Sequence, residues 1–136
     1  GYRRRAINPN DPRDPGSIAM ISPTGGLRVY VATRPTDFRK GMDGLALLVQ
    51  ETMELDPFSG AAFVFRAKRA DRIKVLVWDQ TGIVLIHKRL EGAKFVWPKA
   101  QEGVIKMSPA QFSALFEGLD WRLVRPERVR RPDLAG

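Results

Sequence analysis

The sequence predicts an α+β fold, a mostly antiparallel β-meander of about five or six strands packed with two helices, with flexible basic termini. Short β-prone runs follow one another between residues 61 and 107, and turn signals rather than helices separate them, which argues against a parallel βαβ sheet. Two amphipathic stretches flank this block. With 136 residues, 43% of them hydrophobic and 28% charged, the chain is able to bury a core.

One domain is expected over residues 20–121, between two ends of different composition. Residues 1–19 contain three prolines among Asn, Asp and Gly and almost nothing apolar, so we expect a disordered extension. Met20 is the first possible translation start. Three origins of the preceding segment are therefore considered, namely a tag, a fusion scar and an upstream reading frame. Residues 122–136 form a basic tail whose prolines oppose a regular helix.

The first strand and the first helix are predicted ahead of the meander. Residues 27–32 alternate between apolar and other side chains, which is the periodicity of a strand with one buried face. Residues 33–37 break this strand, and a short turn over residues 38–40 follows. A helix then begins after Asp43 and ends near Leu55, because the Asp-Pro pair that comes next disfavours helical angles.

The meander is predicted from β-branched and aromatic runs. Residues 63–65 form a short strand, and residues 72–89 form a β-hairpin, whose turn is the Asp-Gln-Thr-Gly sequence at 79–82. Further strands are expected at 94–97, where a proline stops the run, and at 104–107.

The last helix has a strong start signal. Ser108 suits the N-cap, Pro109 the first helical position, and Gln111 the third, which together make a capping box. Phe112 begins the apolar stripe of this helix, and Gly118 can close its C-terminus.

The charge favours a polyanionic partner such as nucleic acid, or an acidic protein or membrane. Lys and Arg number 23 and Asp and Glu 15, which gives a net charge of +8, although residues 1–19 and 121–136 carry more than half of it. The absence of cysteine excludes disulfides, zinc–thiolate sites and cysteine nucleophiles, and a cytoplasmic location fits. No apolar run is long enough to span a membrane, and no secretory signal follows the arginines at 3–5.

Signals for catalysis are weak. His87 is the single histidine, so a histidine-rich metal site is excluded. Asp71 and Asp79 offer carboxylates for a Mg²⁺-dependent nuclease, but Asp79 also fits a hairpin turn. The sequence contains no phosphate-binding loop, dinucleotide fingerprint or serine elbow. We therefore expect no enzyme activity, no cofactor and no bound metal.

Nucleic-acid binding has a better candidate site, a cluster of basic side chains on two segments. The outer ends of a hairpin lie together, so residues 66–74 and 88–94 are expected to merge into one patch that contacts phosphates without reading sequence. The predicted contact residues are Arg66, Lys68, Arg69, Arg72, Lys74, Lys88, Arg89 and Lys94.

Two other features have competing interpretations. Trp78 and Trp97 suit stacking on exposed bases, but packing in the core or in turns is the favoured interpretation of both. Arg39, Lys40 and the turn at 56–60 could present an interface for a partner protein.

A series of ordered motifs adds a family resemblance that covers about Met20 to Trp121. The motifs are TDFRKGMDGLA at 36–46, DPFSG at 56–60, FVFR at 63–66, DRIK at 71–74, WD at 78–79, KRLEG at 88–92 and FVWP at 95–98. As a set, they resemble the second-reading-frame accessory proteins, called TnpB, of the bacterial insertion sequence sixty-six group.

The resemblance implies a helper role in transposition, beside a separate transposase that carries the catalytic acids. It supplies no active-site residues. The leading hypothesis is thus a non-catalytic accessory protein that binds DNA through the basic patch. The alternatives are a protein-interaction module that recruits or assembles the transposase, and a metal-dependent nuclease. The sequence leaves the oligomeric state and the preferred DNA open.

Overall fold

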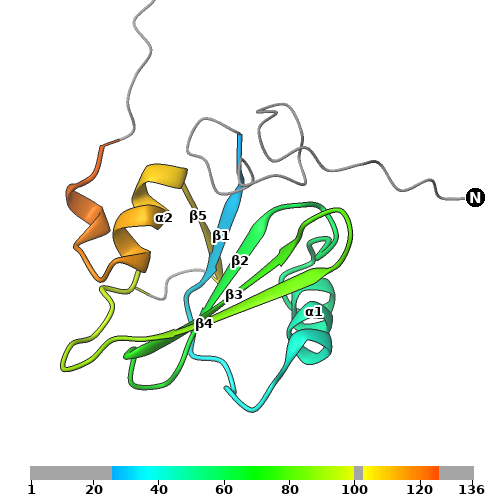
Figure 1. The fold of residues 1–136 in the computed structure, drawn as a ribbon, viewed down its shortest axis with the longest axis horizontal. Helices are drawn as coiled ribbons and strands as arrows, with labels where there is room; N and C mark the ends of the chain where they lie inside the picture. Colours follow the sequence, from blue (N-terminus) through cyan, green and yellow to red (C-terminus); the bar gives the residue numbers. More distant parts are fainter. Residues whose placement is uncertain (1–25, 100–102, 126–136) are drawn as a thin grey trace, which may run out of the picture.

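The computed structural model describes residues 26–99 and 103–125 (Figure 1). The expected extension over residues 1–19, the candidate start at Met20 and residues 126–136 of the predicted basic tail (122–136) lie outside the described residues. The first residues of that tail are described, and 122–123 belong to a short 3₁₀ helix.

A five-stranded sheet forms the centre of the described structure, in the order β4-β3-β2-β1-β5. Two α-helices and a short 3₁₀ helix accompany it, so the predicted α+β fold is confirmed. In chain order the elements are β1 (Val29–Ala32), α1 (Met42–Glu51), β2 (Ala62–Arg66), β3 (Arg72–Trp78), β4 (Ile83–Arg89), β5 (Val104–Met107), α2 (Pro109–Phe116) and η2 (Trp121–Leu123).

The antiparallel meander accounts for only part of the sheet. β2, β3 and β4 pair antiparallel in sequence order, as predicted. However, β1 and β2 pair in parallel, so the sheet is mostly antiparallel, as predicted, with one parallel pair that the sequence did not indicate. The chain leaves β1, crosses through α1 and returns to start β2 beside it, which is the connection that parallel neighbours need. β5 pairs antiparallel with β1 and not with the end of the meander.

The strand predicted at residues 94–97 is absent from the sheet. This segment is instead held by single hydrogen bonds to distant elements. The Phe95 amide donates to the Ala70 carbonyl at 2.7 Å, and the Trp97 indole donates to the Ala32 carbonyl at 2.9 Å. The Trp121 indole donates to the carbonyl of Val96. These anchors cross several elements, so local β propensity did not reveal them.

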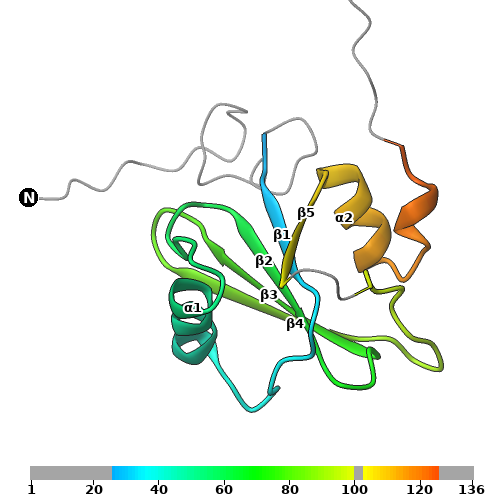
Figure 2. The same cartoon turned by 180° about the vertical axis from the view of Figure 1, so that it is seen from behind.

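Each face of the sheet buries its own apolar cluster, and the two helices lie on opposite faces (Figures 1 and 2). Val64, Val75 and Leu115 belong to the cluster under α2. Leu45 and Phe63 belong to the cluster under α1. Because β2 and β3 carry buried side chains on both faces, residues 62–65 of β2 and residues 75–78 of β3 form continuous apolar runs rather than alternating ones.

Local sequence signals predicted the starts of both helices to within two residues. The predicted capping box of α2 is confirmed, because the Ser108 hydroxyl accepts from the Gln111 amide while the Gln111 side chain accepts from the Ser108 amide. α1 begins at Met42, within two residues of the prediction, and ends at Glu51, earlier than expected. Gly118 follows α2 with a φ of 83°, a conformation that favours glycine.

A buried lysine connects the sheet to the loop after β1. Lys74 is only 7% exposed, and its ammonium donates to the carbonyls of Phe38 at 2.7 Å and Lys40 at 2.9 Å. The ammonium also lies 4.9 Å from the centroid of the Phe38 ring, within cation–π range. These contacts fix residues 38–40 against the α1 face of the sheet.

Removing the Lys74 ammonium should destabilise the fold. We expect Lys74→Met, which keeps the aliphatic stem, to lower the free energy of unfolding by about 1–3 kcal/mol, because two carbonyls lose their donor. Urea denaturation followed by circular dichroism measures this change. Lys68→Met is the matched control at an exposed position and should stay within about 0.5 kcal/mol of the parent. A Lys74→Met protein as stable as the control would contradict this account.

Candidate nucleic-acid interface

Three loops meet at one end of the sheet, which we call the basic end (residues 33–41, 67–71 and 90–94). The parallel strands β1 and β2 both finish there, β3 starts there and β4 finishes there (Figure 1). The Thr36 amide donates to the Arg66 carbonyl at 3.0 Å, and the Leu90 amide donates to the Asp71 carbonyl at 2.8 Å. The loops are therefore hydrogen-bonded to the strand ends beside them.

The two basic segments of the sequence prediction do lie side by side. Arg72 stands opposite Arg89 in the β3–β4 register. Arg69 and Lys94 line the same shallow depression, of about 310 Å³, at the tips of the two connections. The hairpin argument thus predicted the adjacency of the segments correctly.

Three of the predicted residues present free charges. Lys68, Arg69 and Lys94 are exposed, and none of them has an ion-pair partner among the described residues. Lys68 and Arg69 occupy a tight turn in which the Ala70 amide donates back to the Ala67 carbonyl at 3.0 Å. A turn of this kind leaves long side chains directed into solvent, where they can reach a phosphate.

Arg72 and Arg89 make weak ion pairs that a phosphate can replace. Arg72 lies 3.9 Å from Asp71, and Arg89 lies 2.9 Å from Glu91, with both arginine side chains about half exposed. Exposed pairs of this kind contribute little to stability. Both arginines line a shallow depression of about 330 Å³ together with His87. A bidentate contact from either guanidinium to a phosphate is chemically favourable there.

Arg66 and Lys88 are occupied within the protein on the α2 side of the sheet. The Lys88 ammonium donates to the Phe116 carbonyl at the end of α2 and lies 4.5 Å from the centroid of the Phe116 ring. Arg66 donates to the Lys68 carbonyl at 3.1 Å and lies 6.0 Å from the centroid of the Trp97 ring. Their charged groups serve packing, so we leave both residues out of the interface.

Lys74 is also left out of the candidate interface. The burial and the two carbonyl contacts described above hold its ammonium inside the protein. The expectation that Lys74 touches a phosphate is incompatible with that position. The reason is its depth along β3, because Arg72 stands at the strand end, whereas Lys74 lies two residues further in, under the loop after β1.

The structure adds cations that the sequence prediction did not assign to this site. Arg34 and Lys40 are exposed in the loop after β1, and neither has an ion-pair partner among the described residues. Arg39 pairs with Asp37 at 2.8 Å, and its hydrogen bonds hold the pKa of the Asp37 carboxyl far below the usual value. The sequence did mark Arg39 and Lys40, but only as a possible protein interface, because nothing local placed them beside the β3–β4 hairpin.

Carboxylates collect at the opposite end of the sheet. Glu51 is the last residue of α1, Glu54 and Asp56 follow the helix, and Asp79 begins the β3–β4 turn. Asp79 accepts from the Thr81 and Gly82 amides, and these hydrogen bonds lower its pKa. The basic end contains acids as well, because Asp37, Asp71 and Glu91 lie in its loops, each paired with an arginine, and Asp43 lies close by at the start of α1.

The nuclease hypothesis gains no support from this geometry. Asp71 precedes β3 and Asp79 follows it, so roughly 20 Å of strand separates the two carboxylates. Within residues 26–99 and 103–125, no group of three His, Cys, Asp or Glu side chains could hold a metal. Asp71 and Asp79 each have a local structural role, in an ion pair and in a turn.

The tryptophans pack against the protein. Trp78 meets Phe58 edge to face with centroids 5.4 Å apart, at the end of β3 away from the basic end. Trp97 donates its indole hydrogen to Ala32 and is half-buried. The packing interpretation of both side chains fits these contacts, and stacking on bases does not.

The pKa of His87 depends on the positive charges near the basic end. It faces Lys74 across the β3–β4 pair and packs edge to face on Phe38, at 5.4 Å between centroids. Partial desolvation, followed by the positive charges of Lys74, Arg72 and Arg89, lowers the pKa of the imidazole below its ordinary 6.5. The site thus disfavours additional positive charge.

An NMR titration of this single histidine should give a midpoint below 6.5. The unfolded chain takes up the proton first, so the stability that neutral His87 contributes is complete above pH 6.5 and is lost as pH falls towards the folded pKa. Arg72→Ala and Arg89→Ala should each raise the midpoint, whereas Arg122→Ala, far along the chain, should not. A midpoint at or above 6.5 in the parent protein would contradict this electrostatic picture.

No helix among the described residues is long and apolar enough to cross a membrane. No solved structure matches the chain.

The chain has close relatives in Sinorhizobium fredii (strain NBRC 101917 / NGR234). The uncharacterized protein y4jC is 50% identical over 113 residues, which cover 83% of this chain and 97% of the relative. The uncharacterized protein y4hO is 45% identical over 117 residues, covering 86% of this chain and all of the relative. The model of the family described as IS66 Orf2 like protein matches residues 27–126, which include the sheet and both helices. The chain therefore belongs to the IS66 Orf2-like family, the resemblance that its motifs indicated.

Proposed function

We propose that this protein is a non-catalytic accessory factor of insertion-sequence transposition that binds DNA through the basic end and assists a separate transposase. Its family supports the insertion-sequence accessory role. DNA binding and its position on the protein are our inference. The proposal places the protein beside the bacterial DNA, in the cytoplasm.

A single observation carries the proposal, namely the convergence of exposed cations from three separate loops onto one end of the sheet. Lys68 and Arg69 come from the β2–β3 turn, Lys94 comes from the loop after β4, and Lys40 comes from the loop after β1. Arg72 and Arg89 extend this surface along the β3–β4 pair. Three acids of these loops, Asp37, Asp71 and Glu91, are already paired with arginines.

Such a surface suits the phosphate backbone rather than the bases. Lysine and arginine side chains on mobile stems neutralise phosphates and release counterions, which gives affinity without sequence information. Neither helix is placed to enter a groove as a recognition helix, because α1 and α2 cover the sheet faces and the basic end is made of loops. Weak sequence preference is therefore expected, and a partner would supply site selection.

The proposal predicts steeply salt-dependent DNA affinity. Fluorescence anisotropy with a short duplex of element-end sequence, and with one of random sequence, should give a linear fall of log affinity with log salt. Lys68→Ala and Arg69→Ala should each reduce the slope by about one, because each removes one phosphate contact. Lys106→Ala on β5 is the matched control, since it removes one exposed charge outside the basic end.

Unchanged affinity and slope in a Lys68→Ala/Arg69→Ala double variant would overturn the assignment of this site. If DNA alone does not bind, and the transposase co-purifies with the protein after nuclease treatment, the protein-interaction hypothesis replaces this one.

The single histidine provides a second readout that locates the DNA. A phosphate bound at Arg72 and Arg89 would offset their positive charge, so duplex DNA should raise the pKa of His87 towards its ordinary value. An NMR titration of His87 with and without the duplex measures this shift. DNA that binds without moving this pKa lies elsewhere on the protein.

A further inference from the structure

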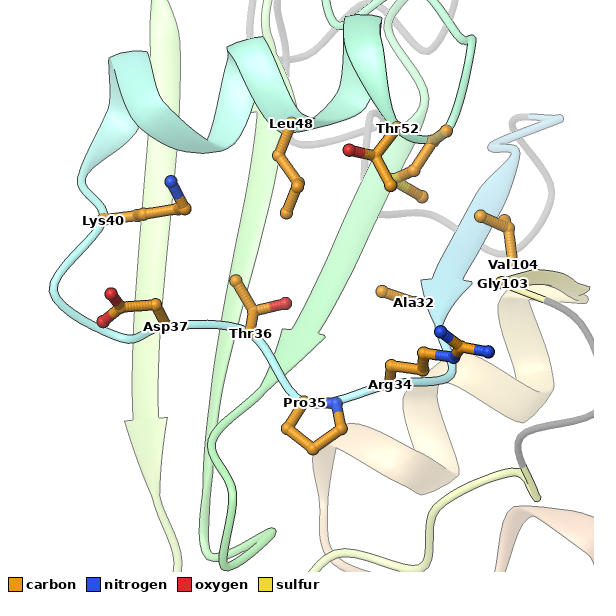
Figure 3. Close-up of a pocket in the computed structure, with 11 residues that line it drawn as sticks. Ala32, Arg34, Pro35, Thr36, Asp37, Lys40, Leu48, Thr52, Gly103 and Val104 are labelled. Carbon is orange, nitrogen blue, oxygen red and sulfur yellow. The ribbon is translucent and has the colours of Figure 1, made fainter.

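An apolar groove lies on the α1 side of the sheet, next to the basic end (Figure 3). Its volume is about 520 Å³, which is within the range of sites that bind defined ligands. Ala32 and Val104 form its floor, on neighbouring strands, and Leu48 and Met53 contribute from the helix side. Pro35 and Thr36 line it from the loop after β1, as Figure 3 shows.

The topology creates this groove. α1 packs over β3 and β4, near one edge of the sheet, whereas β5 forms the opposite edge. The α1-facing side chains of β1 and β5 therefore have less cover, and the pair formed by Ala32 and Val104 is too small to fill the space. A groove of this kind is a place where a further apolar group can be buried.

The rim of the groove is positively charged. Arg34 and Lys40 line it, both exposed and both without an ion-pair partner among the described residues. Asp37 also lines it, but Arg39 already neutralises that carboxylate at 2.8 Å. A ligand with carboxylates beside its apolar part is therefore complementary to this rim.

The groove also borders the edge of the sheet. β5 is the outermost strand next to β1, and within the described residues no strand pairs with its other side. Gly103 and Val104 at its start belong to the groove lining. An extended peptide lying beside β5 could pair with the strand and place a side chain over the groove, as in β-strand addition.

We propose that this groove docks an acidic segment of a partner protein, with one or two large apolar side chains in the groove and flanking carboxylates on Arg34 and Lys40. The inference does not depend on DNA binding, although Arg34 and Lys40 belong both to the rim of the groove and to the loop that the basic end includes. A nucleobase is a poorer fit, because bases bind by stacking on aromatic rings and the lining contains none.

Selection of a phage-displayed random peptide library on the full-length protein tests the proposal. Enriched peptides should combine Leu, Phe or Trp with Asp or Glu within about three positions, the reach of neighbouring side chains on a strand. Amide shifts of ¹⁵N-labelled protein on adding one such synthetic peptide should centre on Ala32, Thr36, Met53 and Val104.

Variants separate the groove from the rest of α1. Thr52→Trp places a large ring in the groove from an exposed position and should abolish peptide binding. Gln50→Trp is the matched control, because residues two apart point to opposite sides of a helix, and it should leave affinity within about twofold. An Arg34→Glu/Lys40→Glu double variant should weaken binding about tenfold through the reversed rim charge.

Several results would overturn the proposal. One is the absence of any enriched peptide, or enrichment of peptides without acidic residues. Another is peptide binding that survives Thr52→Trp. Nuclear Overhauser contacts from the Met53 methyl group to residues 1–25 of the same chain would show that the protein fills its own groove. Shifts at the groove with adenosine monophosphate, but not with the peptide, would assign it to a nucleotide.

Discussion

The ammonium of Lys74 joins the sheet to the loop on which both proposed surfaces depend. A charged group inside a sheet is unfavourable unless its donors are satisfied, and here two backbone carbonyls and the Phe38 ring satisfy them. The same contacts hold residues 38–40 over the start of β3. Lys40, which lines the groove together with Arg34, is therefore held in place because this loop is fixed against the sheet.

The basic residues of the β2–β4 region divide into three groups according to where the strands place them. Lys68, Arg69 and Lys94 lie in loops and remain in solvent. Arg72 and Arg89 lie at strand ends and are half-exposed on the α1 side. Arg66, Lys74 and Lys88 lie where other elements cover them, and their charges bind carbonyls and rings. A run of cations in the sequence thus leaves some charges in solvent and uses the others to hold elements of the fold together.

Two neighbouring surfaces of different chemistry follow from this arrangement. The basic end offers dispersed positive charge, which suits a phosphate backbone, and the groove offers buried apolar area with a charged rim, which suits a protein segment. They share the loop after β1, so a partner in the groove and DNA on the basic end would lie within reach of one another. For an accessory protein of an insertion sequence, that proximity would bring a second protein close to bound DNA.

The sequence by itself determined the features whose atoms lie within a few residues of one another. The turn at Asp79, the capping box of Ser108 and Gln111 and the β3–β4 hairpin are of this kind, and the hairpin also brought the two basic segments together. Only the tertiary structure decided the parallel pairing of β1 with β2, the place of β5 at the far edge, the burial of Lys74 and the groove. These depend on contacts between residues more than thirty positions apart in the chain, such as Lys74 with Phe38 and Trp97 with Ala32. Local propensity carries no information about such contacts, because packing of the whole sheet selects among strand orders that are locally equivalent.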